Sequence, residues 1–183
     1  IGDHNIAGAD VPAFVAALKD ENNRVKFFAA QGLAKTSLPA GDPSLTSVAT
    51  ALLAALRANN NDDGTLRHAL VMGLVGSKAT ATLTAAIADP APAVRLGVLL
   101  AFRRLKDPAV AKFLNDADAY LVREAAIAIN DAPIVEAMPA LAALAGGLLW
   151  LLFVAELHLG WGALFMAILA AMLLIGCGTA LDS

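Results

Sequence analysis

A short pattern recurs four times in the first 130 residues of the chain: an apolar residue followed at once by a basic one, near the start of an alanine-rich stretch. Small or apolar residues stand three and seven positions after each apolar residue, so they share one face of an α-helix. The pairs are Val25-Lys26, Leu66-Arg67, Val94-Arg95 and Val122-Arg123, at spacings of 41, 28 and 28 residues. Such a repeat predicts stacked copies of one helical unit.

The residues before each pair mark where helices are expected to begin. Asp63, Asp89 and Asp118 can accept hydrogen bonds from the free amides of a first helical turn. Pro92 and Pro108 fit helix starts, because the missing proline N–H has no partner to lose there. No alternating strand pattern of useful length appears. The sequence therefore predicts an all-α fold, with helices near residues 11–19, 23–36, 44–58, 64–76, 78–88, 92–106, 108–115, 118–130 and 133–145.

Two of the repeats carry a known signature. The segment from Asp89 to Arg95 (Asp-Pro-Ala-Pro-Ala-Val-Arg) resembles the Asp-x-x-x-x-Val-Arg signature of HEAT repeats, and the segment from Asp118 to Ala126 is a second match. The earlier repeats match less well, with Lys26 in the place of arginine. The resemblance covers residues 10–145 and implies an α-solenoid of antiparallel helix pairs, but a HEAT fold does not specify a function.

A narrower resemblance implies a larger parent protein. The segment from Leu121 to Ile134, with the segment from Ala137 to Ala142, is similar to the HEAT regions of large exported bacterial proteins. Those proteins join a sugar-dehydrogenase-like propeller, a HEAT array and a C-terminal c-type cytochrome. The resemblance implies an extracytoplasmic spacer whose redox chemistry lies in other domains. Because the sequence lacks a CxxCH motif, no haem ligand is carried over and no cofactor is expected.

Charged residues are distributed unevenly along the chain. All 13 lysines and arginines lie at or before Arg123, and 14 of the 16 acidic residues lie at or before Glu136. Glu156 and Asp182 are the only charged residues among residues 137–183. We therefore divide the chain into a HEAT-like solenoid of residues 1–145 and an apolar helical tail of residues 146–183.

The apolar tail is long enough to enter a membrane. Uncharged runs cover residues 137–155 and 157–181, and about 20 apolar residues span a bilayer core. Gly146 and Gly147 weaken the first run, so residues 157–181 are the better candidate span, and a hairpin turning at residues 156–160 is possible. As alternatives to membrane insertion, the tail could form buried terminal helices of the solenoid, could mediate dimerisation through its apolar face, or could be a segment foreign to the fold. The absence of lysine and arginine from the tail favours a cytoplasmic solenoid, whereas the resemblance favours export.

No catalytic constellation is apparent in the sequence. His4, His68 and His158 share no metal-ligand spacing, and the single Cys177 excludes an internal disulfide framework. Glu156 within the apolar tail marks either a functional site or, more simply, the turn between two spans. We therefore expect a non-enzymatic protein without metal or cofactor. The net charge of −3 argues against nucleic-acid binding.

The basic residues of the repeat have two interpretations. They could form a ladder that binds an acidic partner, or each could bond an aspartate or a helix-end carbonyl and hold neighbouring repeats in register. The regular spacing favours the second interpretation, so Arg95→Ala and Arg123→Ala should both lower stability. The predicted structural ladder comprises Lys26, Arg67, Arg95, Arg123, Asp63, Asp89 and Asp118.

These patterns lead to one main hypothesis and one alternative. The main hypothesis is a HEAT-repeat scaffold that contacts a protein partner or a neighbouring domain and is attached to a membrane by its tail. The partner would meet the helices of residues 23–36, 64–76, 92–106 and 118–130. The alternative is a HEAT spacer from a larger exported redox enzyme. No small-molecule substrate is evident in either case.

Overall fold

The computed structural model describes residues 10–36, 38–39, 41–131, 133–152 and 154–155. Regular structure in these residues is helical and includes no β-strand, which confirms the predicted all-α class. The chain divides into two compact units, Ile1–Leu141 and Ala142–Ser183. The sequence expectations for His4, Glu156, His158, Cys177 and the run of residues 157–181 lie outside the described residues.

The first unit is a succession of short helices close to the predicted positions. Two differences concern local helix type. The segment predicted over residues 78–88 begins at Thr80 and ends in a 3₁₀ turn, and the segment at residues 108–115 is 3₁₀ throughout. The elements are α1 (Val11–Ala17), α2 (Asn23–Ala34), α3 (Pro43–Asn59), α4 (Gly64–Ser77), α5 (Thr80–Ala85), η2 (Ala86–Ala88), α6 (Pro92–Leu105), η3 (Pro108–Asn115), α7 (Ala119–Asp131) and η4 (Val135–Ala137).

At the start of several of these helices, a side chain accepts hydrogen bonds from the free amides of the first turn. Asp63 accepts from the amides of Thr65 and Leu66 at the start of α4, as the sequence predicts. Asp89 lies two residues before Ala91, the N-cap of α6, and its carboxylate accepts from the Ala91 amide. Asp89 therefore shapes the turn that leads into α6 rather than capping the helix itself.

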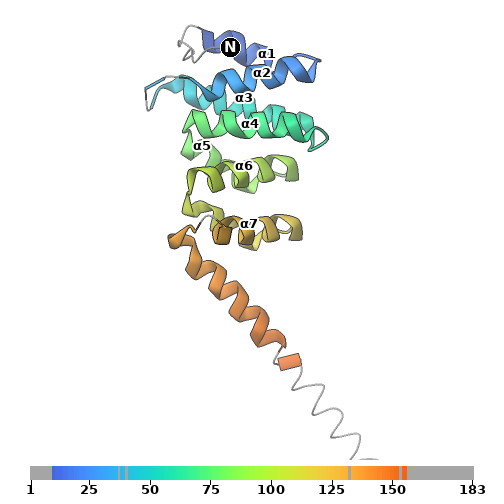
Figure 1. Cartoon of the computed structure of the whole chain (residues 1–183), viewed down its shortest axis with the longest axis vertical. Coiled ribbons are helices and arrows are strands. Elements are labelled where there is room, and N and C mark those ends of the chain that lie inside the picture. The colour runs from blue at the N-terminus through green and yellow to red at the C-terminus, as the bar shows by residue number, and fades with distance from the viewer. Residues whose placement is uncertain (1–9, 37, 40, 132, 153, 156–183) are drawn as a thin grey trace, which may run out of the picture. The chain divides into compact units, whose positions relative to one another are not determined.

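The helices of the first unit form two rows (Figure 1). In one row α2 packs against α4, α4 against α6, and α6 against α7. In the other row α1 contacts α3, and α3 contacts α5. The two rows pack on each other through the α1–α2, α3–α4, η2–α6 and η3–α7 contacts. Each helix of the α2–α4–α6–α7 row therefore lies beside the element that precedes it in the chain.

Small residues let these rows approach closely. A Cβ added at Gly97 would stand 2.4 Å from Leu56 Cδ1, and one at Gly73 would stand 2.8 Å from Leu52 Cδ2. Both glycines occupy the small positions of the repeat, and both leucines are fully buried on α3. The repeat therefore encodes room for a leucine of the neighbouring helix. The larger buried side chains include Phe102 and Phe113.

One helix is long and apolar enough to cross a membrane among the residues described. It covers Val135–Leu152, with a mean hydropathy of 1.7, and 6% of its residues are buried. It continues through Gly146 and Gly147, where an added Cβ would meet nothing within 4 Å. The described candidate span includes Glu136 and otherwise lies in the first uncharged run, which its two glycines made the weaker candidate. Leu148, Leu149, Trp150, Leu151 and Leu152 are all exposed.

Candidate functional site

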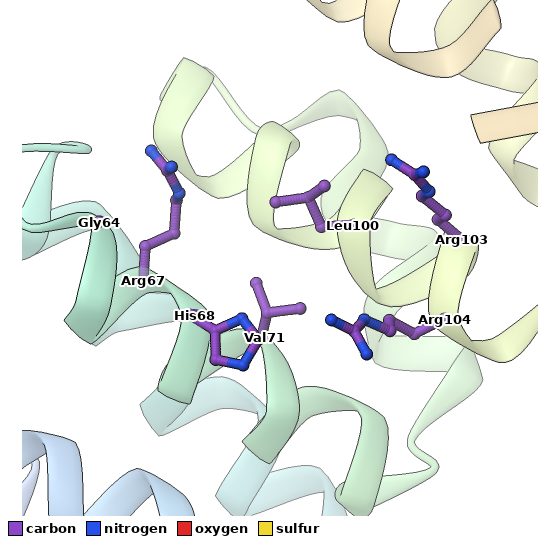
Figure 2. Close-up of a pocket in the computed structure, with 7 residues that line it drawn as sticks. All are labelled: Gly64, Arg67, His68, Val71, Leu100, Arg103 and Arg104. Atoms are coloured by element: carbon purple, nitrogen blue, oxygen red, sulfur yellow. The ribbon is translucent and has the colours of Figure 1, made fainter. Parts of the chain in front are cut away.

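A cavity of about 430 Å³ lies between α4 and α6 (Figure 2). Its basic lining residues come from opposite ends of the two helices, the start of α4 and the last turn of α6. In Figure 2, the side chain of Arg104 points from α6 toward His68 and Val71 on α4. The lining consists of Gly64, Arg67, His68, Val71, Leu100, Arg103 and Arg104.

The cavity is basic and is lined by no acidic residue in the part of the chain that the structure describes. Arg103 Nη2 lies 3.1 Å from the carboxylate of Asp131 on α7, in a pair that is partly open to solvent. Arg67 Nη1 donates to Asn61 Oδ1 at 3.4 Å, a long hydrogen bond. These contacts leave donors on both arginines for a further acceptor, because a guanidinium carries five N–H groups.

A second, more open concavity of about 290 Å³ lies between α2 and α4. It is lined by aromatic residues of α2, and Phe28 is 51% exposed. Phe27 and Phe28 meet edge to face with 5.4 Å between ring centroids, and the Arg24 guanidinium lies 5.9 Å from the Phe28 centroid. Both concavities involve α4, so they occur on consecutive pairs of one helix row.

Asp63 connects α2 with α4 beside this second concavity. It accepts from Asn23 Nδ2 at 3.2 Å in addition to its two capping amides. The hydrogen bond from the Leu66 amide is the largest influence on its pKa. Together with those from Asn23 and Thr65, it outweighs desolvation and holds the pKa of Asp63 below its usual 3.8. Asp63 therefore stays ionised while it caps α4.

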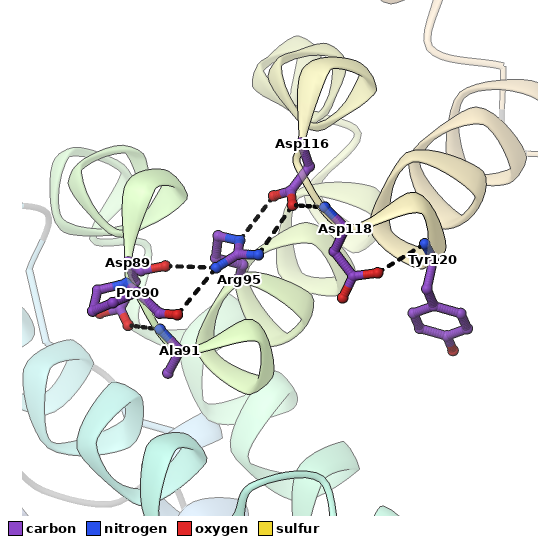
Figure 3. Close-up of polar contacts among 7 residues, drawn as sticks. All are labelled: Asp89, Pro90, Ala91, Arg95, Asp116, Asp118 and Tyr120. Atoms are coloured by element: carbon purple, nitrogen blue, oxygen red, sulfur yellow. Dashed lines mark hydrogen bonds and ion pairs between the residues drawn. The ribbon is translucent and has the colours of Figure 1, made fainter.

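The Arg95 side chain donates four hydrogen bonds and lies at the centre of a polar network (Figure 3). Its Nε and Nη2 donate to the two carboxylate oxygens of Asp116, at 2.8 and 3.0 Å. Its Nη1 donates to the main-chain carbonyls of Asp89, at 2.9 Å, and Pro90, at 3.3 Å. Asp116 also accepts from the amide of Asp118, whose own carboxylate accepts from the amide of Tyr120.

The pKa of Asp116 reflects this network. Burial raises the pKa, but the hydrogen bonds from Arg95 and Asp118 and the positive charge of Arg95 outweigh burial. The pKa of Asp116 is therefore lowered from its usual 3.8. The pair joins α6 to the segment between η3 and α7, and so connects consecutive helix pairs.

The other members of the predicted ladder have different surroundings. Lys26 Nζ donates to Asn23 Oδ1 within α2, and Arg67 reaches Asn61. Arg123 is 71% exposed and lies 3.9 Å from its neighbour Glu124. Of the four basic residues, Arg95 is the one whose bonds, to an aspartate and to carbonyls, match the structural interpretation.

Two of the contacts between helix pairs were not predicted. Arg57 of α3 pairs with Asp89, and Asp116 rather than Asp118 receives Arg95. Asp116 stood in the acidic stretch before the fourth repeat, so its position was visible in the sequence. Which of the two aspartates faces Arg95 depends on the path of the chain after η3.

The described residues include no cluster of three or more His, Cys, Asp or Glu side chains that could hold a metal ion. Comparison with known proteins adds no functional assignment: no family model, curated protein or solved structure matches the chain.

Proposed function

We propose that the chain is a non-enzymatic scaffold of the HEAT-like α-solenoid type. In this proposal the row of α2, α4, α6 and α7 binds a protein partner, and an apolar C-terminal helix attaches the scaffold to a membrane. The observation that carries the proposal is the presence of two concavities between consecutive helices of that row, α2–α4 and α4–α6.

The chemistry of this row favours protein binding. Phe28 on α2 and Tyr120 on α7 are about half exposed, at 51% and 50%. Aromatic residues and arginines supply most of the affinity in protein interfaces, because they bury large areas and retain polar contacts. The row offers arginines as well, at the cavity between α4 and α6. Stacked helical repeats use such extended surfaces to bind partners.

The membrane part of the proposal rests on the helix Val135–Leu152. Its length and composition suit a span, and the leucines near its C-terminal end are exposed. A row of exposed leucines is unfavourable in water, at about 25 cal/mol for each Å² of apolar surface. A lipid environment or a protein partner would remove that cost.

Site-specific photo-cross-linking in cells that express the full chain would test partner binding. A photoreactive phenylalanine analogue would replace Phe28 on α2 or Tyr120 on α7, with Asn115 at the end of η3 as the matched control position. We expect the same protein adduct from positions 28 and 120 and none from position 115. Absence of adducts, or equal adducts at all three positions, would contradict the proposal.

A further inference from the structure

The cavity between α4 and α6 has the chemistry of an anion-binding site. We propose that it binds the carboxylate or phosphate groups of an acidic segment in the protein partner, with Arg67, Arg103 and Arg104 as the recognising residues. This inference rests on the proposed scaffold function and names the chemistry of the partner. The cavity volume of about 430 Å³ is sufficient for a few side chains and lies within the usual range for ligand sites.

The positive charge of the cavity is a local property. The chain as a whole has a net charge of −3. Nevertheless, three arginines and His68 line this cavity, with no acidic lining residue among those described. Guanidinium groups gathered in one concavity repel one another, and an anion in their midst relieves that repulsion. Charge complementarity therefore favours an acidic occupant.

The electrostatics of the helices do not explain this arrangement. Arg103 and Arg104 lie in the last turn of α6, where cations complement the negative end of the helix dipole. Arg67, however, lies near the start of α4, where the dipole is positive and a cation is unfavourable. A bound anion would offset this cost, because both the positive end of the α4 dipole and the charge of Arg67 attract it.

The arginines are available to a ligand. The side chain of Arg104 takes part in no hydrogen bond or ion pair in the described part of the chain. Arg103 pairs with Asp131, but their side chains are 33% and 50% exposed, and such solvent-accessible pairs contribute little stability. An incoming carboxylate or phosphate can therefore displace Asp131 at little cost.

The apolar residues of the cavity add a second element of recognition. Val71 is buried on α4, and Leu100 on α6 is half-buried, and both line the cavity. A segment in which anionic and aliphatic side chains alternate would place its charges on the arginines and its apolar groups on these two residues. Partial exclusion of water would strengthen the charged hydrogen bonds.

Fluorescence anisotropy with the full chain in nonionic detergent tests the site. The probes are a labelled peptide of alternating glutamate and leucine, the same peptide with phosphoserine for glutamate, and the same peptide with glutamine. The test variant is Arg67→Gln/Arg104→Gln. The control is Lys19→Gln/Lys112→Gln, which removes the same charge from exposed positions near α1 and on η3.

We expect the anionic peptides to bind and the glutamine peptide not to bind. The relative affinity of the two anionic peptides distinguishes carboxylate from phosphate as the natural group. The test variant should bind about tenfold more weakly for each arginine removed, whereas the control should bind like the unmodified chain. Equal losses in both variants, or binding of the glutamine peptide, would overturn the proposal.

Two further outcomes separate this inference from the scaffold function. If the cross-linked partner is still captured by Arg67→Gln/Arg104→Gln at full yield, the anion site is wrong while the scaffold function stands. If the test variant loses binding to phosphatidylserine vesicles but keeps peptide binding, the site recognises lipid and the proposal fails. Peptide binding without any cross-linked partner would instead contradict the scaffold function alone.

Discussion

The guanidinium of Arg95 in α6 holds both carboxylate oxygens of Asp116, from Nε at 2.8 Å and from Nη2 at 3.0 Å. The two side chains are only 14% and 7% exposed. Bidentate pairs of this kind are stronger and more directional than single hydrogen bonds. Because Asp116 lies between η3 and α7, the pair fixes the position of the last helix pair against α6.

Loss of this pair should lower stability measurably. Arg95→Ala leaves the mostly buried Asp116 carboxylate without its main donor, so we expect a loss of about 1–3 kcal/mol in unfolding free energy. Thermal or urea denaturation measures this value. The sequence predicted a similar loss for Arg123→Ala, but Arg123 is 71% exposed, and we now expect a change within about 0.5 kcal/mol. Equal losses in the two variants would argue against a special role for Arg95.

Stability should decline in acid through Asp116 and Asp63, whose pKa values are lowered in the folded chain. A group with a lowered folded pKa stabilises fully above its unfolded pKa, and this contribution disappears as the pH falls through the folded pKa. We expect a constant melting temperature between pH 7 and about pH 5 and a decline below about pH 4.

The melting temperature of Asp116→Asn as a function of pH tests whether Asp116 causes part of the decline in acid. This variant should be less stable at pH 7, and its melting temperature should change less between about pH 5 and pH 2 than that of the unmodified chain. Melting curves that run parallel over the whole range would show that Asp116 does not contribute to the acid sensitivity.

Close packing between α2 and α4 should make Gly76 intolerant of a side chain. A Cβ at this position would stand 2.4 Å from the carbonyl oxygen of Ala34, a main-chain atom that cannot rotate away. We expect Gly76→Ala to destabilise by about 1–3 kcal/mol despite the better helix propensity of alanine. Gly64→Ala in the same helix is the control, because its Cβ would meet only the Arg67 side chain at 3.8 Å. Similar stability of both variants would contradict this packing.

The apolar helix should lose membrane affinity when it carries a charge. Leu149 is 67% exposed, so Leu149→Asp should leave the fold of the first unit intact. An aspartate in a span costs up to about 3 kcal/mol, with the largest cost at the centre, so the variant should move from the detergent phase or from vesicles into the aqueous phase. Asn115→Asp adds the same charge on η3 and should partition like the unmodified chain. Unchanged partitioning of Leu149→Asp would exclude this helix as the anchor.

Much of the helical organisation could be predicted from the sequence. Caps such as Asp63 and prolines such as Pro92 act within a few residues of their own position, and small residues such as Gly97 mark one face of their own helix. Their effects on helix starts and on one helical face were therefore visible in the repeat. The exceptions were the segments at residues 78–88 and 108–115, where the pattern indicated a helix but could not distinguish 3₁₀ from α geometry.

Ion-pair partners and the basic cavity required the tertiary structure. The sequence did not indicate that Arg67 and Arg104 are neighbours, and packing of α4 against α6 brought them to one cavity. Similarly, the sequence did not assign Arg95 to a particular aspartate, and the path of the chain after η3 placed Asp116 against it. Local backbone chemistry thus determines where helices lie in the chain. Contacts between residues that are distant in sequence depend instead on how those helices pack, because packing involves side chains from several elements at once.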